Sequence, residues 1–436
     1  MLPKLLQEWL ETASAQLRCR RAVPDVRQEL ESHVAEQYSA LRAAGRDEEA
    51  AAQETVQSMG DAVQVGVSLD AVHRPRPAWG PVLALGAVLL LSRLLWVWGG
   101  RPPQTVLDIL PALLALTVTA YGGDISRLAK HGTALYLLYS LFLSALPFFP
   151  GTRTVNGRVQ YAEALCMLLV PLYALAVYTW KGRGLPGLLA CAALLLPGLW
   201  ACMVMPLLAG CVELALAALA LGIYCCFKDW FGWGRRRSFA MLGVVFGLLL
   251  LAAALFLWKE GFFLPQRWNR VLSVLFPARD PQGSGYIALL RQSIWMRELP
   301  AGFTPQDLAG LLADFPLTYW FYRLGEWPVL AALALLTGSL ALLARCARQV
   351  KNAAGRLTAL ACGVMAVIQL IGNLLSGAGL WSLTVSLPFL GGASACCAQA
   401  VLAGLLLSAF RYDPVTAEHP VPGETKKRLH LSVEWR

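Results

Sequence analysis

The sequence lacks the cysteine spacing of a metal centre. Its eleven cysteines form no CxxC pair, and no histidine lies near them. Ten of the eleven fall in or beside apolar stretches, among them the adjacent pairs Cys225-Cys226 and Cys396-Cys397. Structural metal sites need closely spaced Cys and His ligands. We therefore interpret the cysteines as residues that pack within a membrane.

A cleavable signal peptide is also not expected at the N-terminus. The first 76 residues form a polar segment with helical periodicity, and the first long apolar run begins only at Trp79. Gly45 and Gly60 stand where helices would end, so the segment is predicted to contain three small helices. We expect residues 1–76 to form a cytoplasmic helical domain.

Long apolar runs dominate the rest of the chain, whose mean hydropathy is +0.54 overall. A helix needs about 20 apolar residues to cross a hydrocarbon core of roughly 30 Å. The sequence therefore predicts an all-α, polytopic membrane protein with about ten transmembrane helices, preceded by a small soluble helical domain. The ten apolar windows are 79–98, 105–121, 133–149, 162–180, 185–203, 207–227, 239–258, 327–343, 357–375 and 391–410.

The distribution of basic residues predicts the orientation in the membrane. Residues 1–76 carry 12 acidic and 9 basic side chains, and the remainder holds 15 acidic against 28 basic. Such an excess in a membrane protein indicates cytoplasmic loops and anionic headgroups before nucleic acid, so no nucleic-acid partner is expected. The short loops on one side contain only Arg101, Arg153 and Arg158 as basic residues, and the basic residues of the long loop 259–326 do not count because long loops cross regardless of charge. The positive-inside rule then places both termini in the cytoplasm and the long loop 259–326 outside.

A polar, glycine-rich stretch, "DPQGSGY", occupies residues 280–286 of that outer loop. An aspartate that can bond nearby backbone amides, followed by Gly-x-Gly, is typical of a compact turn. A phosphate-binding loop is a weaker interpretation, because no strand precedes the glycines and no lysine follows them. We expect a structural turn made by Asp280, Gly283, Gly285 and Tyr286.

The longer run "LPQRWNRVLSVLFPARDPQGSGY", residues 264–286, resembles an outer-loop motif of the SEDS family (shape, elongation, division and sporulation), which includes FtsW, RodA and SpoVE. Three further segments agree with the family in order, and together they cover most of residues 79–411. Matching positions in the outer loop are Arg267, Arg270, Val271, Leu272, Pro277, Asp280, Pro281, Gly283, Gly285 and Tyr286. Matching positions elsewhere are Gly151, Arg153, Gln160, Glu163, Asp314, Phe315, Gly325, Asn373, Gly379, Leu380, Thr384, Leu387, Pro388, Phe389, Gly391 and Gly392.

The N-terminal segment has its own resemblance. Its "ELESH", "SMGD" and "LDAVHRP" stretches are similar to the permease prefix domain, a helical module that precedes various membrane proteins. The predicted organisation is thus a prefix domain over 1–76, a ten-span membrane domain over 77–411 and a disordered cytoplasmic tail over 412–436.

The SEDS resemblance implies a peptidoglycan glycosyltransferase of the bacterial cytoplasmic membrane, acting in cell division, shape or sporulation. It implies a lipid-linked disaccharide-peptide precursor as substrate and a class B penicillin-binding transpeptidase as partner. Asp314 matches the family's essential aspartate, which implies a general base, and no cofactor is required, although a divalent metal is compatible with the chemistry. The residues expected to bind substrate are Arg153, Glu163, Arg267, Arg270 and Arg291.

Several of these residues have simpler interpretations. Asp314 has a rival in Asp307, seven residues earlier, and either could be an ordinary polar residue of an outer loop. Glu163 opens an apolar window, where an acidic residue stabilises a helix N-terminus. Glu213 lies inside an apolar window, where an ionisable side chain either serves a function or pairs with a polar neighbour in the bundle interior.

The sequence also departs from the family. Thr154-Val155 replaces an Arg-Trp pair, Cys166 replaces a lysine, and Pro206–Gly210 has lost the aspartate of a P-D-x-G-T motif. The two glutamates expected after Asp314 are Tyr322 and Arg323. Because a fold readily survives loss of chemistry, two alternatives stay open beside the enzyme: an inactive scaffold for cell-wall synthesis partners, and a transporter of the lipid precursor.

Overall fold

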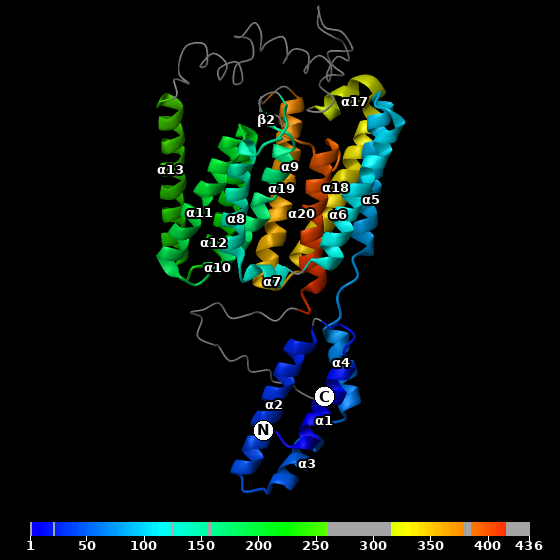
Figure 1. The fold of residues 1–436 in the computed structure, drawn as a ribbon, viewed down its shortest axis with the longest axis vertical. Coiled ribbons are helices and arrows are strands. Elements are labelled where there is room, and N and C mark those ends of the chain that lie inside the picture. Colours follow the sequence, from blue (N-terminus) through cyan, green and yellow to red (C-terminus); the bar gives the residue numbers. More distant parts are fainter. Residues whose placement is uncertain are drawn as a thin grey trace, which may run out of the picture. The chain divides into compact units, whose positions relative to one another are not determined.

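The structure is a computed structural model that describes residues 2–20, 22–123, 125–155, 158–259, 315–378, 380 and 385–415. The described residues form two compact units (Figure 1). The N-terminal unit consists of Met1–Pro77 together with Phe410–His419, and the membrane unit contains Ala78–Ala409.

The N-terminal unit contains four helices, where the sequence predicted three. Gly60 ends the third helix with φ +81°, and the Asp61 side chain then caps the fourth by accepting a hydrogen bond from Gln64 N at 3.0 Å. The predicted helix end at Gly60 thus lies between two helices, and the second of these is the additional one. The helices are α1 (Lys4–Ala15), α2 (Val23–Ala43), α3 (Glu48–Met59) and α4 (Ala62–Val72).

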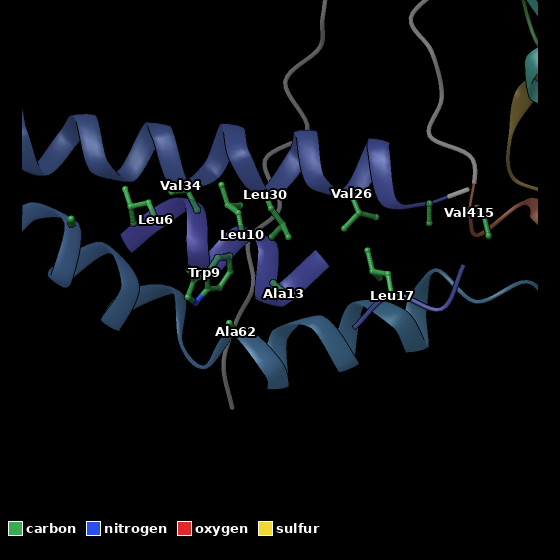
Figure 2. Packing of buried hydrophobic residues seen from close by; sticks show 12 residues of the cluster. Leu6, Trp9, Leu10, Ala13, Leu17, Val26, Leu30, Val34, Ala62 and Val415 are labelled. Carbon is green, nitrogen blue, oxygen red and sulfur yellow. The ribbon is translucent and has the colours of Figure 1, made fainter. Parts of the chain in front are cut away.

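The core of this unit lies between α1 and its neighbours (Figure 2). Leu6 and Leu10 of α1 face Leu30 and Val34 of α2, and all four are buried. Trp9 is also buried, but its ring lies on the other side of α1, near Ala62 (Figure 2). The Trp9 indole also donates a hydrogen bond to Gly60 O at 2.9 Å, which satisfies its only polar atom.

Residues 412–415 belong to this unit, although the sequence predicted that a disordered tail begins at 412. Val415 is buried in the core (Figure 2). Asp413 forms an ion pair with Arg76 at 3.6 Å, and the backbone N–H of Arg76 donates to Arg411 O at 3.0 Å. These four residues are ordered because the burial of Val415 and the pairing of Asp413 offset the entropy that is lost when the segment is fixed. Residues 416–436 lie outside the described part.

The regular secondary structure that is described in the membrane unit is helical apart from one pair of two-residue strands, which confirms the prediction of an all-α polytopic membrane protein. Within the described residues, nine helical segments are long and apolar enough to cross a membrane. The elements are α5 (Trp79–Trp98), η1 (Pro103–Asp108), α6 (Ile109–Gly122), α7 (Ile125–Ala129), α8 (Gly132–Ala145), η2 (Leu146–Phe148), β1 (Thr154–Val155), β2 (Arg158–Val159), α9 (Ala162–Met167), α10 (Leu169–Thr179), α11 (Gly184–Val204), α12 (Leu208–Phe227), α13 (Arg235–Lys259), α17 (Pro316–Leu324), α18 (Glu326–Arg348), α19 (Ala353–Gly377) and α20 (Ala393–Tyr412).

The third predicted span, 133–149, corresponds to an apolar helical segment that is shorter than the nine above. It forms α8 and η2, together Gly132–Phe148, because Pro147 lies two residues after the end of α8 and cannot continue its hydrogen bonding. The first predicted span, in contrast, coincides with α5 at both ends.

Helix α19 is central to the bundle and packs against α10, α12, α17 and α18. Its N-terminus is capped by Asn352, whose side chain accepts from Ala354 N at 3.0 Å. Two glycines allow close helix approach: a Cβ on Gly132 would overlap Leu175 O, and one on Gly404 would overlap Thr119. Helix α13 stands at the edge of the bundle, and almost none of its described residues are buried (Figure 1).

Candidate active site

The catalytic residue and most of the substrate-binding residues predicted from the sequence lie outside the described residues. These are Asp314, Arg267, Arg270 and Arg291, together with the turn residues Asp280, Gly283, Gly285 and Tyr286. Two of the predicted site residues, Arg153 and Glu163, are described.

Helix α17 begins two residues after Asp314 and is firmly attached to the bundle. Phe315 is buried, as is Trp320 in the middle of the helix. The Thr318 hydroxyl donates to Gly377 O at 3.0 Å, and the Tyr319 hydroxyl donates to Gly99 O at 2.7 Å. The chain immediately after Asp314 is thus fixed to the ends of α5 and α19.

Arg153 is exposed and begins a short hairpin that leads into α9. Strands β1 and β2 pair antiparallel with Val155 opposite Arg158, and Gln160 N donates to Arg153 O at 2.9 Å. This hairpin and α9 lie at the same end of the membrane unit as α17 (Figure 1). The exposed guanidinium of Arg153 is therefore available at that end.

Glu163 lies in the first turn of α9, but its role differs from simple capping of its own helix. Its Oε1 atom accepts a hydrogen bond from Ser386 N at 2.8 Å, across 223 positions of sequence. The carboxylate thereby holds the segment that connects α19 to α20, and the bond is charge-assisted and accordingly strong.

That segment, residues 385–392, runs through the bundle without helical structure. Backbone groups at membrane depth must be satisfied by protein, because no water competes there. Side chains of the surrounding helices supply the partners. Asn373 Nδ2 donates to Val385 O at 2.6 Å, Gln399 Oε1 accepts from Phe389 N at 2.6 Å, and Trp96 Nε1 donates to Leu390 O at 3.1 Å.

Arg93 completes this set from α5. Its guanidinium is 2% exposed and donates to Gly391 O at 2.5 Å and to Ser92 Oγ at 2.9 Å. The guanidinium carbon also lies 5.4 Å from the centroid of the Trp96 ring. A buried arginine needs such partners to offset its desolvation. Sequence reasoning did not select Arg93, although an arginine inside the apolar window 79–98 is itself a signal for an interior position.

Glu213 of α12 lies in the interior of the same bundle. Its side chain is 3% exposed, and its Oε1 atom has no hydrogen-bond partner within the described part of the chain. It lies beside Gln369, whose Oε1 accepts from Gln399 Nε2 at 3.1 Å. Of the two interpretations open from the sequence, the structure supports an interior position.

We call Glu163, Glu213, Gln369, Asn373 and Gln399, with the backbone of residues 385–391, the polar cluster. It joins the described end of the predicted site to the bundle interior. Chemically it offers two carboxyl groups and a set of amides, which suits binding and positioning of a polar group. Among the described residues no group of three or more His, Cys, Asp or Glu side chains could hold a metal ion. A divalent ion near Asp314 stays a prediction.

Comparisons with known proteins agree at the level of the fold. No family model matches the sequence, and no curated protein is significantly similar to it in sequence. A chain of a peptidoglycan synthase complex, from work on how that complex coordinates polymerization and crosslinking, has a TM-score of 0.60 and 22% identity. That match covers 77% of this chain and 98% of the other. The rod shape determining protein RodA of Thermus thermophilus has a TM-score of 0.50 and 20% identity, over 77% of this chain and 96% of RodA. The fold implied by the sequence motifs is thus confirmed.

Proposed function

We propose that this protein is a SEDS-like peptidoglycan glycosyltransferase. It polymerises a lipid-linked disaccharide-peptide precursor at the outer face of the bacterial cytoplasmic membrane. The observation that carries the proposal is the coincidence of two independent signals: the membrane unit has the fold of RodA, and the motif at residues 264–286 matches the SEDS outer loop in register.

The reaction assigns distinct roles to acidic and basic residues. The acceptor hydroxyl attacks the anomeric carbon of the donor sugar, the bond from that carbon to the diphosphate oxygen breaks, and the hydroxyl proton passes to a carboxylate. Asp314 is that base. The polyprenyl diphosphate leaves with negative charge, which guanidinium groups stabilise by bidentate hydrogen bonds. Arg153, Arg267, Arg270 and Arg291 supply them.

The described residues around α17 support the assignment of Asp314. A general base must be held within hydrogen-bond reach of its proton, and the residue that follows Asp314 is buried against the bundle. The polar cluster then has a supporting role. Glu163 and Gln399 hold residues 386 and 389 in place, next to the end of the bundle where α17 lies.

Partners and orientation complete the proposal. A class B penicillin-binding transpeptidase crosslinks the glycan strands that this protein makes, and both termini lie in the cytoplasm. The N-terminal unit is then a cytoplasmic prefix domain.

A polymerisation assay tests the proposal. Purified full-length protein, with a cognate transpeptidase, is given lipid-linked precursor, and glycan strands are separated by length. We expect polymer from the wild type and from Asp307→Ala, and none from Asp314→Ala at equal folding. Precursor binding without polymer from the wild type would instead support a scaffold.

One observation favours that second candidate. Cys166 occupies the position where the family has a lysine, and its thiol is buried 3.9 Å from the sulfur of Met205. The charged side chain that the resemblance implies at this position is thus replaced by apolar packing. If the same replacement has removed catalysis, the fold serves to recruit cell-wall synthesis partners.

A further inference from the structure

A cavity lies between α18, α19 and α20. Its volume is about 460 Å³, within the roughly 300–1,000 Å³ that is usual for small-molecule sites. Tyr224 of α12 closes one side. Leucine, valine, isoleucine and alanine side chains form most of the wall, and Gln369 and Gln399 are at its inner end. The cavity is therefore shaped and lined for a hydrocarbon chain.

Its other end is positively charged. Arg348, the last residue of α18, and Arg356, in the first turn of α19, both line the cavity, and both are exposed. Neither forms an ion pair with a described acidic residue. Two arginines at one mouth suit a phosphate group, which a guanidinium binds through paired N–H donors.

The length of the cavity matches one leaflet. Arg356 and Gln369 are thirteen residues apart on α19, which is about 20 Å at a rise of 1.5 Å per residue. Half of a hydrocarbon core is roughly 15 Å. A ligand with its phosphate at Arg356 therefore extends its tail to about the bilayer midplane.

We propose that this cavity binds an anionic glycerophospholipid of the bilayer. The phosphate lies between Arg348 and Arg356, and one acyl chain fills the space between α18, α19 and α20. The basic loop 345–356 is predicted to be cytoplasmic, so the lipid comes from the inner leaflet, whose anionic headgroups attract such residues. The site is separate from the proposed reaction at the outer face and does not depend on it.

Gly363 provides a direct way to close the cavity. It lines the apolar wall, and a Cβ added there meets no atom within 4 Å. Gly363→Phe therefore places a ring in the space of the acyl chain without displacing the protein. Gly338 of α18 has equally open surroundings but does not line the cavity, so Gly338→Phe is a matched control.

The charged mouth has its own control. Arg345 is exposed on the last turns of α18 but does not line the cavity. Arg345→Gln removes the same charge from the same end of the helix. The pair Arg348→Gln and Arg356→Gln is exposed at the surface, so folding is preserved even if Gly363→Phe fails to fold.

The experiment is native mass spectrometry of the full-length protein, released from vesicles that contain equal amounts of phosphatidylglycerol and phosphatidylcholine. We expect the wild type to retain phosphatidylglycerol selectively. A basic residue near an anionic membrane surface contributes about 1 kcal/mol, which is about fivefold in affinity. The double arginine variant should therefore retain about 25-fold less, Gly363→Phe should lose both lipids, and both controls should match the wild type.

Three results would overturn the proposal. The first is equal retention of the two lipids by the wild type. The second is unchanged retention by the double arginine variant. The third is displacement of phosphatidylglycerol by a much lower concentration of polyprenyl phosphate, which would assign the cavity to the substrate lipid instead.

Discussion

Replacing Gln399 by leucine should destabilise the membrane unit strongly. The Gln399 amide accepts from Phe389 N at 2.6 Å and donates to Gln369 Oε1 at 3.1 Å, and the side chain is 2% exposed. Leucine is similar in size but leaves both partners buried and unsatisfied. Each such group costs about 1–3 kcal/mol, so the free energy of unfolding should fall by about 2–6 kcal/mol.

Thermal melting in detergent measures this change. One kcal/mol corresponds to roughly 2–4 °C for chains of 150–250 residues, so we expect a decrease of at least about 4 °C. Gln104→Leu is the control, because that glutamine is exposed in η1 and its replacement should change stability by less than about 0.5 kcal/mol. A melting temperature for Gln399→Leu within the error of the Gln104→Leu value would refute the account of how residues 385–391 are held.

Three other changes test neighbouring features. Glu163→Ala should cost about 1.5–3 kcal/mol in thermal melting because Ser386 N loses a charged acceptor, whereas Glu163→Gln should recover most of that loss; equal melting of the two variants would contradict the hydrogen bond. Glu213→Leu should raise the free energy of unfolding by about 1–3 kcal/mol, and with it the melting temperature, because it removes a buried carboxyl oxygen that has no hydrogen-bond partner in the described part of the chain. A lower melting temperature would show that this carboxyl oxygen is satisfied. Val415→Asp should destabilise the N-terminal unit by about 3 kcal/mol or more and increase its amide hydrogen exchange, whereas Val67→Asp, at a position 56% exposed, should not; identical exchange in the two would show that residue 415 is not part of the core.

The transmembrane helices could be predicted from hydropathy because their signal is local. Each needs only a run of apolar residues of sufficient length, and the window at 79–98 matched α5 at both ends. The window at 162–180 did not reveal that its helix is broken into α9 and α10. No residue there forbids a continuous helix except Pro171, which lies in the first turn of α10, so hydropathy alone could not place the break.

The polar cluster was harder to predict, since its members are far apart in sequence. Glu163 and Asn373 were selected by motif and Glu213 by its position in an apolar window, whereas Gln369 and Gln399 were not selected at all. A glutamine in an apolar helix can face lipid, a partner or the interior, and only the fold distinguishes these. The contact of Glu163 with Ser386 spans 223 positions, and no local pattern encodes it.

The C-terminal tail, residues 412–436, also could not be predicted fully from local sequence patterns. The composition of residues 412–436, with its prolines and basic residues, indicated disorder for the whole segment. The first four residues instead complete the core of the N-terminal unit, because Val415 is buried and Asp413 pairs with Arg76. A segment of four residues is too short for composition to distinguish from the residues that follow it.

We propose that this protein polymerises glycan with Asp314 as its base. The most direct test is the initial rate of polymerisation from purified lipid-linked precursor, measured for the wild type, Asp314→Asn and Asp307→Asn in the same vesicles. General base catalysis contributes about 10²–10⁴-fold. We predict a loss of at least about 100-fold for Asp314→Asn and an unchanged rate for Asp307→Asn. Equal rates for all three proteins would contradict the claim.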